Sequence, residues 1–97
     1  MDVSIIIPVL NEAERLKTLL PQLRRRSESG AVQEIIVVDG GSEDGSPEVA
    51  ARNGARVVNA PRGRARQMNA GARSARGEIL YFLHAIPDLS RVLTALL

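Results

Sequence analysis

Short apolar runs alternate along the chain with segments in which apolar residues recur at helical spacing. The apolar runs are short enough to be strands, and polar or glycine-rich breaks separate them from the helical segments. The predicted strands cover residues 3–7, 34–38, 56–59 and 79–83. The predicted helices cover residues 12–26, 46–53, 63–76 and 88–97. This order predicts a parallel sheet with helices on its faces.

The fold class that follows is α/β, a Rossmann-like three-layer sandwich with a mainly parallel four-stranded sheet. At 97 residues the chain is predicted to form one domain, residues 1–97. A dinucleotide-binding fold would place Gly-x-Gly-x-x-Gly after the first strand, whereas this chain has Pro8 to Glu12 there. The sequence therefore argues against NAD and for a different nucleotide arrangement.

The helical segments show which sides we expect to be buried. In the first helix the apolar stripe is Ala13, Leu16, Leu19, Leu20 and Leu23. Pro21 is predicted to kink or divide that helix. Ser46, followed by Pro47, is predicted to be the N-cap of the second helix. The third helix is predicted to bury Ala65, Met68, Ala72 and Ala75.

Asp39 ends an apolar run and begins a loop rich in glycine and acid, residues 40–46. Carboxyl ends of strands line the ligand crevice of open α/β sheets, so this carboxylate is placed where binding or chemistry occurs. Asp, Gly and Ser are also ordinary turn formers, so the loop alone indicates a functional role and a plain connection between strand and helix about equally. For Asp44 we favour the structural interpretation, a bond to the backbone of its own loop.

Charge and composition narrow the partner classes. Lys17 is the one lysine among 13 basic residues, and arginine suits phosphate and carboxylate ligands. Nucleic acid is disfavoured because the chain has one Tyr and one Phe for stacking. The absence of cysteine fits a reducing compartment, and no apolar run reaches membrane-spanning length. We expect a cytoplasmic protein, and a place beside a membrane stays open.

Four motifs, in this order and spacing, carry a family resemblance that covers the chain up to residue 85. They are residues 4–12 (SIIIPVLNE), 34–46 (EIIVVDGGSEDGS), 63–72 (GRARQMNAGA) and 77–85 (GEILYFLHA). Together they strongly resemble the N-terminal half of family 2 glycosyltransferases of the GT-A fold. The resemblance implies a nucleotide-sugar donor, UDP- or GDP-linked, and a divalent metal, Mg²⁺ or Mn²⁺, bridging its two phosphates.

The resemblance also implies roles for particular residues. Pro8, Asn11 and Glu12 would line the nucleoside pocket, and Asp39 would accept a hydrogen bond from the base. An ionised carboxylate is an acceptor-only group, which suits a base imino N–H. The candidate donor-binding residues, including those of the third helix discussed next, are Pro8, Asn11, Glu12, Asp39, Gly41, Arg64 and Asn69.

The 63–72 segment departs from many relatives, which carry an Arg-Asn pair where this chain has Met68 and Asn69. Arg64 lies in the first turn of the predicted helix, where free N–H groups and the helix dipole favour an anion. We expect Arg64 to contact the diphosphate, Arg66 to be solvated and Met68 to be core. Asn69 either holds the loop or touches the ligand.

The segment after Ala85 departs further, because Ile86-Pro87-Asp88 stands where the family has its metal-binding acid. We expect Asp88 to cap the last helix, and His84 alone is a poor site for a hard metal. No metal ligand or catalytic residue is therefore assigned, and we expect a truncated chain that is incomplete for catalysis. The alternative is a non-catalytic nucleotide-binding or assembly module, a homo-oligomer joined through the C-terminal helix or a sheet edge.

Overall fold

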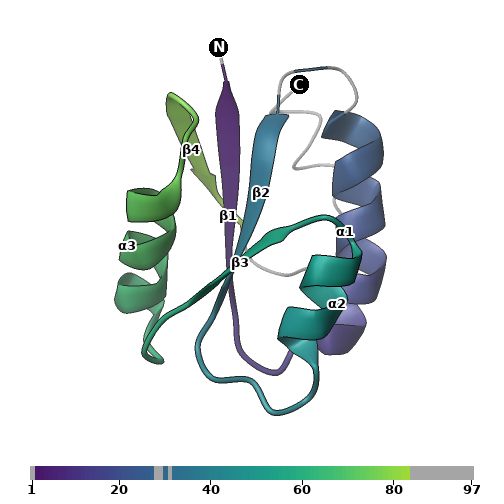
Figure 1. Cartoon of the computed structure of the whole chain (residues 1–97), viewed down its shortest axis with the longest axis vertical. Coiled ribbons are helices and arrows are strands. Elements are labelled where there is room, and N and C mark those ends of the chain that lie inside the picture. The colour runs from purple at the N-terminus through teal and green to yellow at the C-terminus, as the bar shows by residue number, and fades with distance from the viewer. Residues whose placement is uncertain (1, 28–29, 31, 84–97) are drawn as a thin grey trace.

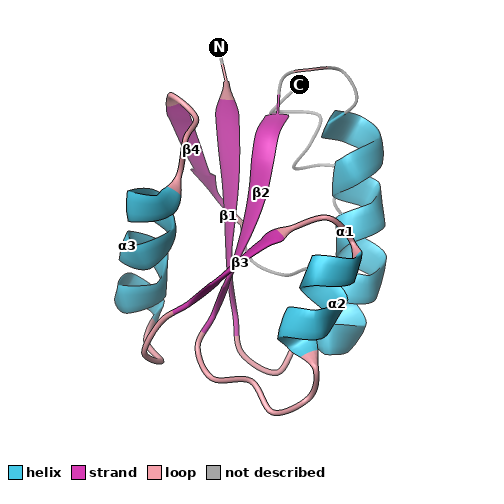
Figure 2. Ribbon diagram, in the orientation of Figure 1, coloured by secondary structure: helices cyan, strands magenta, loops and turns pink. Residues whose placement is uncertain are grey.

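The computed structural model describes residues 2–27, 30 and 32–83. In this part of the chain the strands form one parallel sheet in the order β3-β2-β1-β4, with α1 and α2 on one face and α3 on the other (Figures 1 and 2). The elements are β1 (Val3–Val9), α1 (Ala13–Ser27), β2 (Val32–Asp39), α2 (Ser46–Arg52), β3 (Arg56–Asn59), α3 (Arg64–Ser74) and β4 (Ile79–Phe82). The predicted three-layer α/β sandwich is confirmed, and the helix predicted at 88–97 lies outside the described residues.

Alternation along β1 divides the core between the two faces. Ile5 and Ile7 pack in the cluster that contains the apolar stripe of α1, while Ile6 packs in the cluster that contains the alanines of α3. Successive side chains of a strand point to opposite faces, so one apolar run supplies both cores. Every residue predicted for the α1 stripe is buried: Ala13, Leu16, Leu19, Leu20 and Leu23.

Two prolines lie inside elements that they were expected to end or interrupt. β1 continues through Pro8 to Val9 and stays paired with β2 there, with Pro8 opposite Val38 and Val9 opposite Asp39. Helix α1 continues through Pro21 and is not divided. Its buried leucines lie on both sides of Pro21, and their packing offsets the lost hydrogen bond.

The predicted buried face of helix α3 is only partly correct. Ala72 and Ala75 pack against the sheet as predicted, whereas Ala65 is exposed and Met68 only partly buried. The buried residues of the helix are Gln67 and Gly71. A Cβ at position 71 would lie 2.4 Å from Cγ2 of Ile6, so only glycine allows this approach. The apolar pattern did not indicate Gln67 and Gly71 because neither carries an apolar side chain.

Glu34 ties together the amino-terminal end of the sheet. Its Oε2 accepts the Ser4 hydroxyl (2.8 Å) and the Arg76 N–H, and its Oε1 accepts Nη2 of Arg56 (2.8 Å). Burial opposes ionisation here, but the hydrogen bonds from Arg76, Arg56 and Ser4 outweigh it and lower the pKa of Glu34. This network lies at the end of the strands opposite the site described below.

Candidate functional site

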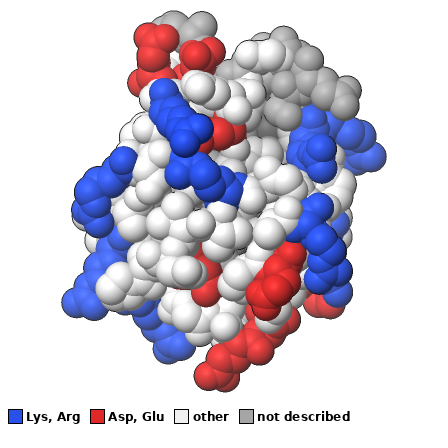
Figure 3. Space-filling model, viewed as in Figure 1, with Lys and Arg blue, Asp and Glu red and all other residues white. Residues whose placement is uncertain are grey.

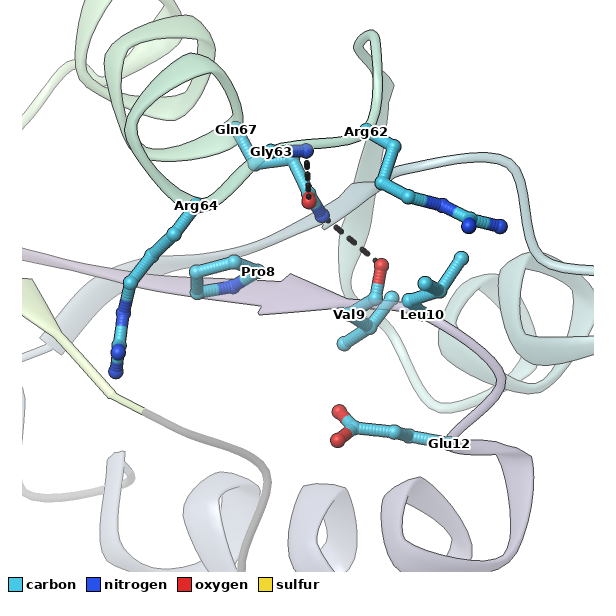
Figure 4. Close-up of a pocket in the computed structure, with 8 residues that line it drawn as sticks. All are labelled: Pro8, Val9, Leu10, Glu12, Arg62, Gly63, Arg64 and Gln67. Carbon is cyan, nitrogen blue, oxygen red and sulfur yellow. Dashed lines mark hydrogen bonds between the residues drawn. The ribbon is translucent and has the colours of Figure 1, made fainter.

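The strand order places a crevice at the carboxyl end of β1. The chain steps from β1 to β2 to β3 in one direction and then returns to β4 on the other side of β1. Ligands of open α/β sheets bind at such a reversal. A cavity of about 360 Å³ lies there, between the start of α1 and the start of α3 (Figure 4). Its lining residues are Pro8, Val9, Leu10, Glu12, Arg62, Gly63, Arg64 and Gln67.

The start of α3 forms the basic wall of this cavity. Its N-cap residue Gly63 has no side-chain cap, and the first turn of the helix contains no acid. Arg62 and Arg64 line the cavity on either side of Gly63. The N-terminal N–H groups and the helix dipole add positive potential to that of the two guanidinium groups. This wall favours an anionic group.

The start of α1 forms the opposite wall and is already capped by another loop. The backbone N–H groups of residues 11–13 all donate to side chains of loop 42–46. The bonds run from Asn11 to Ser42 Oγ (2.8 Å), from Glu12 to Ser46 Oγ (2.9 Å) and from Ala13 to Asp44 Oδ2 (3.0 Å). These N–H groups are therefore engaged, and the Glu12 carboxylate points from this wall into the cavity (Figure 4).

The surface charge follows the same division. The segment 60–77 contains five arginines and no acid. Figure 3 shows Lys and Arg side chains along the α3 side and also beside α1 and α2, while Asp and Glu side chains gather at the lower end and at the upper end on the α3 side. An anion entering the crevice would therefore be drawn to the α3 wall.

Asp44 and Ser46 act together in this cap. Asp44 Oδ1 accepts the backbone N–H (3.0 Å) and the hydroxyl of Ser46, so the expected bond to its own loop is confirmed. The Ser46 hydroxyl, with the Ala13 N–H next, lowers the pKa of Asp44. The predicted N-cap role of Ser46 is wrong: Gly45, at φ 86°, is the N-cap of α2, and the Ser46 hydroxyl serves α1 instead.

Asp39 ends β2 with its carboxylate turned into its own loop. Its Oδ2 accepts the N–H groups of Gly41 (3.0 Å) and Ser42 (2.9 Å), and its Oδ1 accepts the Ser42 hydroxyl. The residue is 4% exposed. Gly41 adopts φ 98°, a conformation that glycine reaches without strain, and this turn brings the two N–H groups to the carboxylate.

The structure brings some of the predicted site residues together and separates others. Pro8, Glu12 and Arg64 line the cavity. Asn11 lines a neighbouring hollow, to which Glu12 also belongs. Asn69 lies in a separate hollow of about 280 Å³ formed with Arg66, which is exposed as expected. The ligand contacts assigned to all of these residues stay predictions.

The sequence did not indicate five of the residues that line the cavity, and two of these, Arg62 and Gln67, have polar side chains. Gln67 is 5% exposed; its Nε2 donates to the carbonyl oxygens of Val9 and Val38, and its Oε1 accepts the Gly63 N–H. The available signal was its spacing of four residues from Gly71 on the same helix face. For Arg62 the signal was its place directly before the glycine that opens α3.

Metal ligands do not gather in the described part of the chain. Among residues 2–27, 30 and 32–83, no group of three or more His, Cys, Asp or Glu is arranged to hold a metal ion. Of the residues that the structure describes, Glu12 is the one acid that lines the cavity. The segment after Ala85, as well as His84 and Asp88, lies outside the described residues.

Comparison with known proteins identifies the family and supports the fold. Residues 4–85 match the model of Glycosyl transferase family 2. This chain belongs to that family. A family relative is undecaprenyl-phosphate 4-deoxy-4-formamido-L-arabinose transferase of Pseudomonas fluorescens, 38% identical over 96 residues that span 86% of this chain and 27% of the relative. Glycosyltransferase AglE of Haloferax volcanii is 44% identical over 48 residues, 50% of this chain and 16% of AglE.

Solved structures show the same GT-A architecture. Mannosyl-3-phosphoglycerate synthase from Rubrobacter xylanophilus superposes with a TM-score of 0.84 at 27% identity, over 91% of this chain and 32% of that one. Glucosyl-3-phosphoglycerate synthase from Mycobacterium tuberculosis was solved with Mn²⁺, UDP and glucosyl-3-phosphoglycerate. It superposes with a TM-score of 0.80 at 26% identity, over 89% of this chain and 34% of that one. This glycosyltransferase domain thus spans about a third of these two solved chains.

Proposed function

We propose that this domain binds a nucleotide-diphospho-sugar, UDP- or GDP-linked, as the donor for glycosyl transfer. The observation that carries the proposal is the cavity at the end of β1. It has an arginine wall at the start of α3, where the first turn contains no acid, and an acidic wall at the capped start of α1. A diphosphate suits the first wall, and sugar or ribose hydroxyls suit the Glu12 carboxylate on the second.

Within this proposal Arg64 contacts the diphosphate, with Arg62 beside it. Pro8, Asn11 and Glu12 line the nucleoside side, and Asp39 reads the base from the rim of the sheet. The solved relative with UDP and Mn²⁺ in its crystals supports the nucleotide class, because its fold superposes on nearly the whole described chain. Gly41 and Asn69 remain secondary candidates.

The described residues do not fit the divalent metal that the family implies. Mg²⁺ and Mn²⁺ require several oxygen ligands, and the cavity offers one carboxylate, that of Glu12. We therefore assign no metal ligand to the described residues. A bound diphosphate would be neutralised by Arg62, Arg64 and the start of α3.

Calorimetric titration tests the proposal. The chain is titrated with UDP, UDP-sugars and GDP-sugars, with and without Mn²⁺. Binding of one nucleotide class supports the proposal, and absence of binding to all of them refutes it. Arg64→Ala should weaken binding of UDP far more than binding of uridine. Arg66→Ala, the same substitution two residues further along α3, should leave the binding of both unchanged. Asp39→Ala should remove any base preference.

A second candidate, an assembly module, is favoured by the surface of β4. Ile79, Leu80 and Phe82 are 39%, 37% and 41% exposed, on a strand that pairs on one side with β1. Large apolar side chains on an edge strand favour pairing with another copy. Light scattering at micromolar concentration decides: a dimer or larger species supports this candidate, and a monomer contradicts it.

The location of the protein stays a prediction. Within the described residues, no helix has both the length and the apolarity that crossing a bilayer requires. We propose a cytoplasmic site of action, and fractionation of cells that express the chain would test it.

A further inference from the structure

The turn from β1 into α1 depends on Asn11, whose backbone has an unusual conformation. Its φ is 54°, and it is the one non-glycine residue with positive φ in the part of the chain that the structure describes. Asparagine tolerates this region better than most residues, but surrounding contacts must hold it there. Its backbone N–H donates to Ser42 Oγ (2.8 Å), and its Oδ1 accepts the Glu43 N–H (2.8 Å). The loop after β2 therefore fixes the turn that places Glu12 in the cavity.

Ser42 connects this turn to Asp39. A hydroxyl has one proton to donate, and the Ser42 hydroxyl donates it to Asp39 Oδ1 while accepting the Asn11 N–H. One oxygen atom therefore joins the carboxylate at the end of β2 to the residue before Glu12. Ser46 and Asp44 make no such link among the described residues, because their hydrogen bonds hold residues 12 and 13 and each other without reaching Asp39.

The same hydroxyl determines what Asp39 can still offer a ligand. Each carboxylate oxygen has two acceptor positions. Oδ2 fills both with the N–H groups of Gly41 and Ser42, whereas from the described residues Oδ1 receives only the Ser42 hydroxyl. With respect to residues 2–27, 30 and 32–83, one acceptor position is left, on Oδ1. The Ser42 hydroxyl occupies its neighbour and so fixes the direction in which that position points.

We propose that Ser42 is a positioning residue of the donor site, which couples base reading by Asp39 to the placement of Glu12. This inference rests on the proposed nucleotide-sugar function. Without the hydroxyl, the Asp39 carboxylate loses the bond that orients Oδ1, and the Asn11 turn keeps only its bond to Glu43. Removing one oxygen atom therefore disturbs the base side and the opposite wall of the cavity together.

The matched control is Ser46→Ala, which removes a hydroxyl from the same cap. Ser46 is fully buried and accepts the N–H of Glu12, but it does not contact Asp39. Its loss should lower stability without changing the preference between bases. Ser42→Thr keeps the hydroxyl and should restore the behaviour of the unmodified chain. These variants separate positioning of Asp39 from a general weakening of the fold.

The experiment measures the Kd of UDP and of GDP by calorimetry for the unmodified chain and five variants, with thermal unfolding recorded for each. The variants are Ser42→Ala, Ser42→Thr, Ser46→Ala, Asp39→Asn and the double variant Asp39→Asn with Ser42→Ala. Ser42→Ala should weaken binding of the preferred nucleotide by about tenfold or more, as expected for a hydrogen bond to a charged group. Its UDP-to-GDP preference should shrink, and Ser42→Thr should recover it. The double variant Asp39→Asn with Ser42→Ala should bind the nucleotide no more weakly than Asp39→Asn alone, because both changes act on one coupled unit.

The outcomes separate this inference from the function on which it rests. If the unmodified chain binds neither nucleotide, both are overturned. If it binds with a clear base preference and Ser42→Ala keeps that preference, only the role of Ser42 is overturned. A preference lost equally in Ser46→Ala would also overturn it, since the effect would then come from the cap as a whole.

Discussion

Replacing Gln67 by methionine should destabilise the domain although the two side chains have similar length. The Gln67 Nε2 donates to the carbonyl oxygens of Val9 and Val38, both at 2.9 Å, and its Oε1 accepts the Gly63 N–H at 3.2 Å. One side chain thus joins the carboxyl ends of β1 and β2 to the first turn of α3. Methionine would fill the space and make none of these bonds.

The magnitude follows from the three bonds. Each contributes roughly 0.5–1.5 kcal/mol net, and a buried group left without a partner costs about 1–3 kcal/mol. The Val9 carbonyl keeps the Gly40 N–H (3.0 Å), which reduces its share. We expect a total loss of about 2–4 kcal/mol, a large part of the roughly 5–15 kcal/mol that stabilises a typical domain. Gln67→Glu should lose at least as much at neutral pH, because a carboxylate has no proton to donate to either carbonyl.

Urea unfolding followed by circular dichroism measures this loss. The methionine variant should unfold at a lower midpoint with an unchanged slope, since the exposed surface on unfolding is nearly the same. The control is Gln33→Met, the same substitution at an exposed position of β2, which should change stability by less than about 0.5 kcal/mol. A wild-type midpoint for Gln67→Met, or for Gln67→Glu, would refute the reasoning.

Two further predictions concern the sheet. Gly71→Ala should destabilise the domain by about 1–3 kcal/mol in the same assay, because the new Cβ would lie 2.4 Å from Cγ2 of Ile6. Alanine usually stabilises a helix relative to glycine, and a more stable Gly71→Ala variant would contradict this prediction. The lowered pKa of Glu34 means that its stabilising effect is complete above its ordinary value of 4.5 and is lost as pH falls through the lower folded value. The free energy of unfolding of Glu34→Gln should therefore fall less on acidification than that of the unmodified chain. Identical pH dependence of the unfolding free energy in the two proteins would contradict this prediction.

Much of the fold was predictable because burial and periodicity agreed. The sequence shows continuous apolar runs in β1 and β2 and a leucine stripe in α1, and the structure buries these residues. The face of α3 was not predictable in this way. Gly71 is buried because it lacks a side chain, and Gln67 is buried because the ends of two strands offer it carbonyl oxygens. Neither reason is visible in a hydrophobic pattern, since both depend on partners distant in sequence.

The site shows the same limit in its polar residues. Ser42, Asp44 and Ser46 are the residue types of any tight turn, and the sequence predicted a bond within its own loop for Asp44 and an N-cap role for Ser46. The structure confirms the Asp44 bond, and it shows that all three side chains bond residues 11–13, across 31 to 34 positions of the chain. A hydroxyl that caps its own helix and one that caps a neighbouring helix give the same sequence pattern. The glycine-rich loop therefore holds the acidic wall of the cavity in place, and through Ser42 that wall depends on the carboxylate of Asp39.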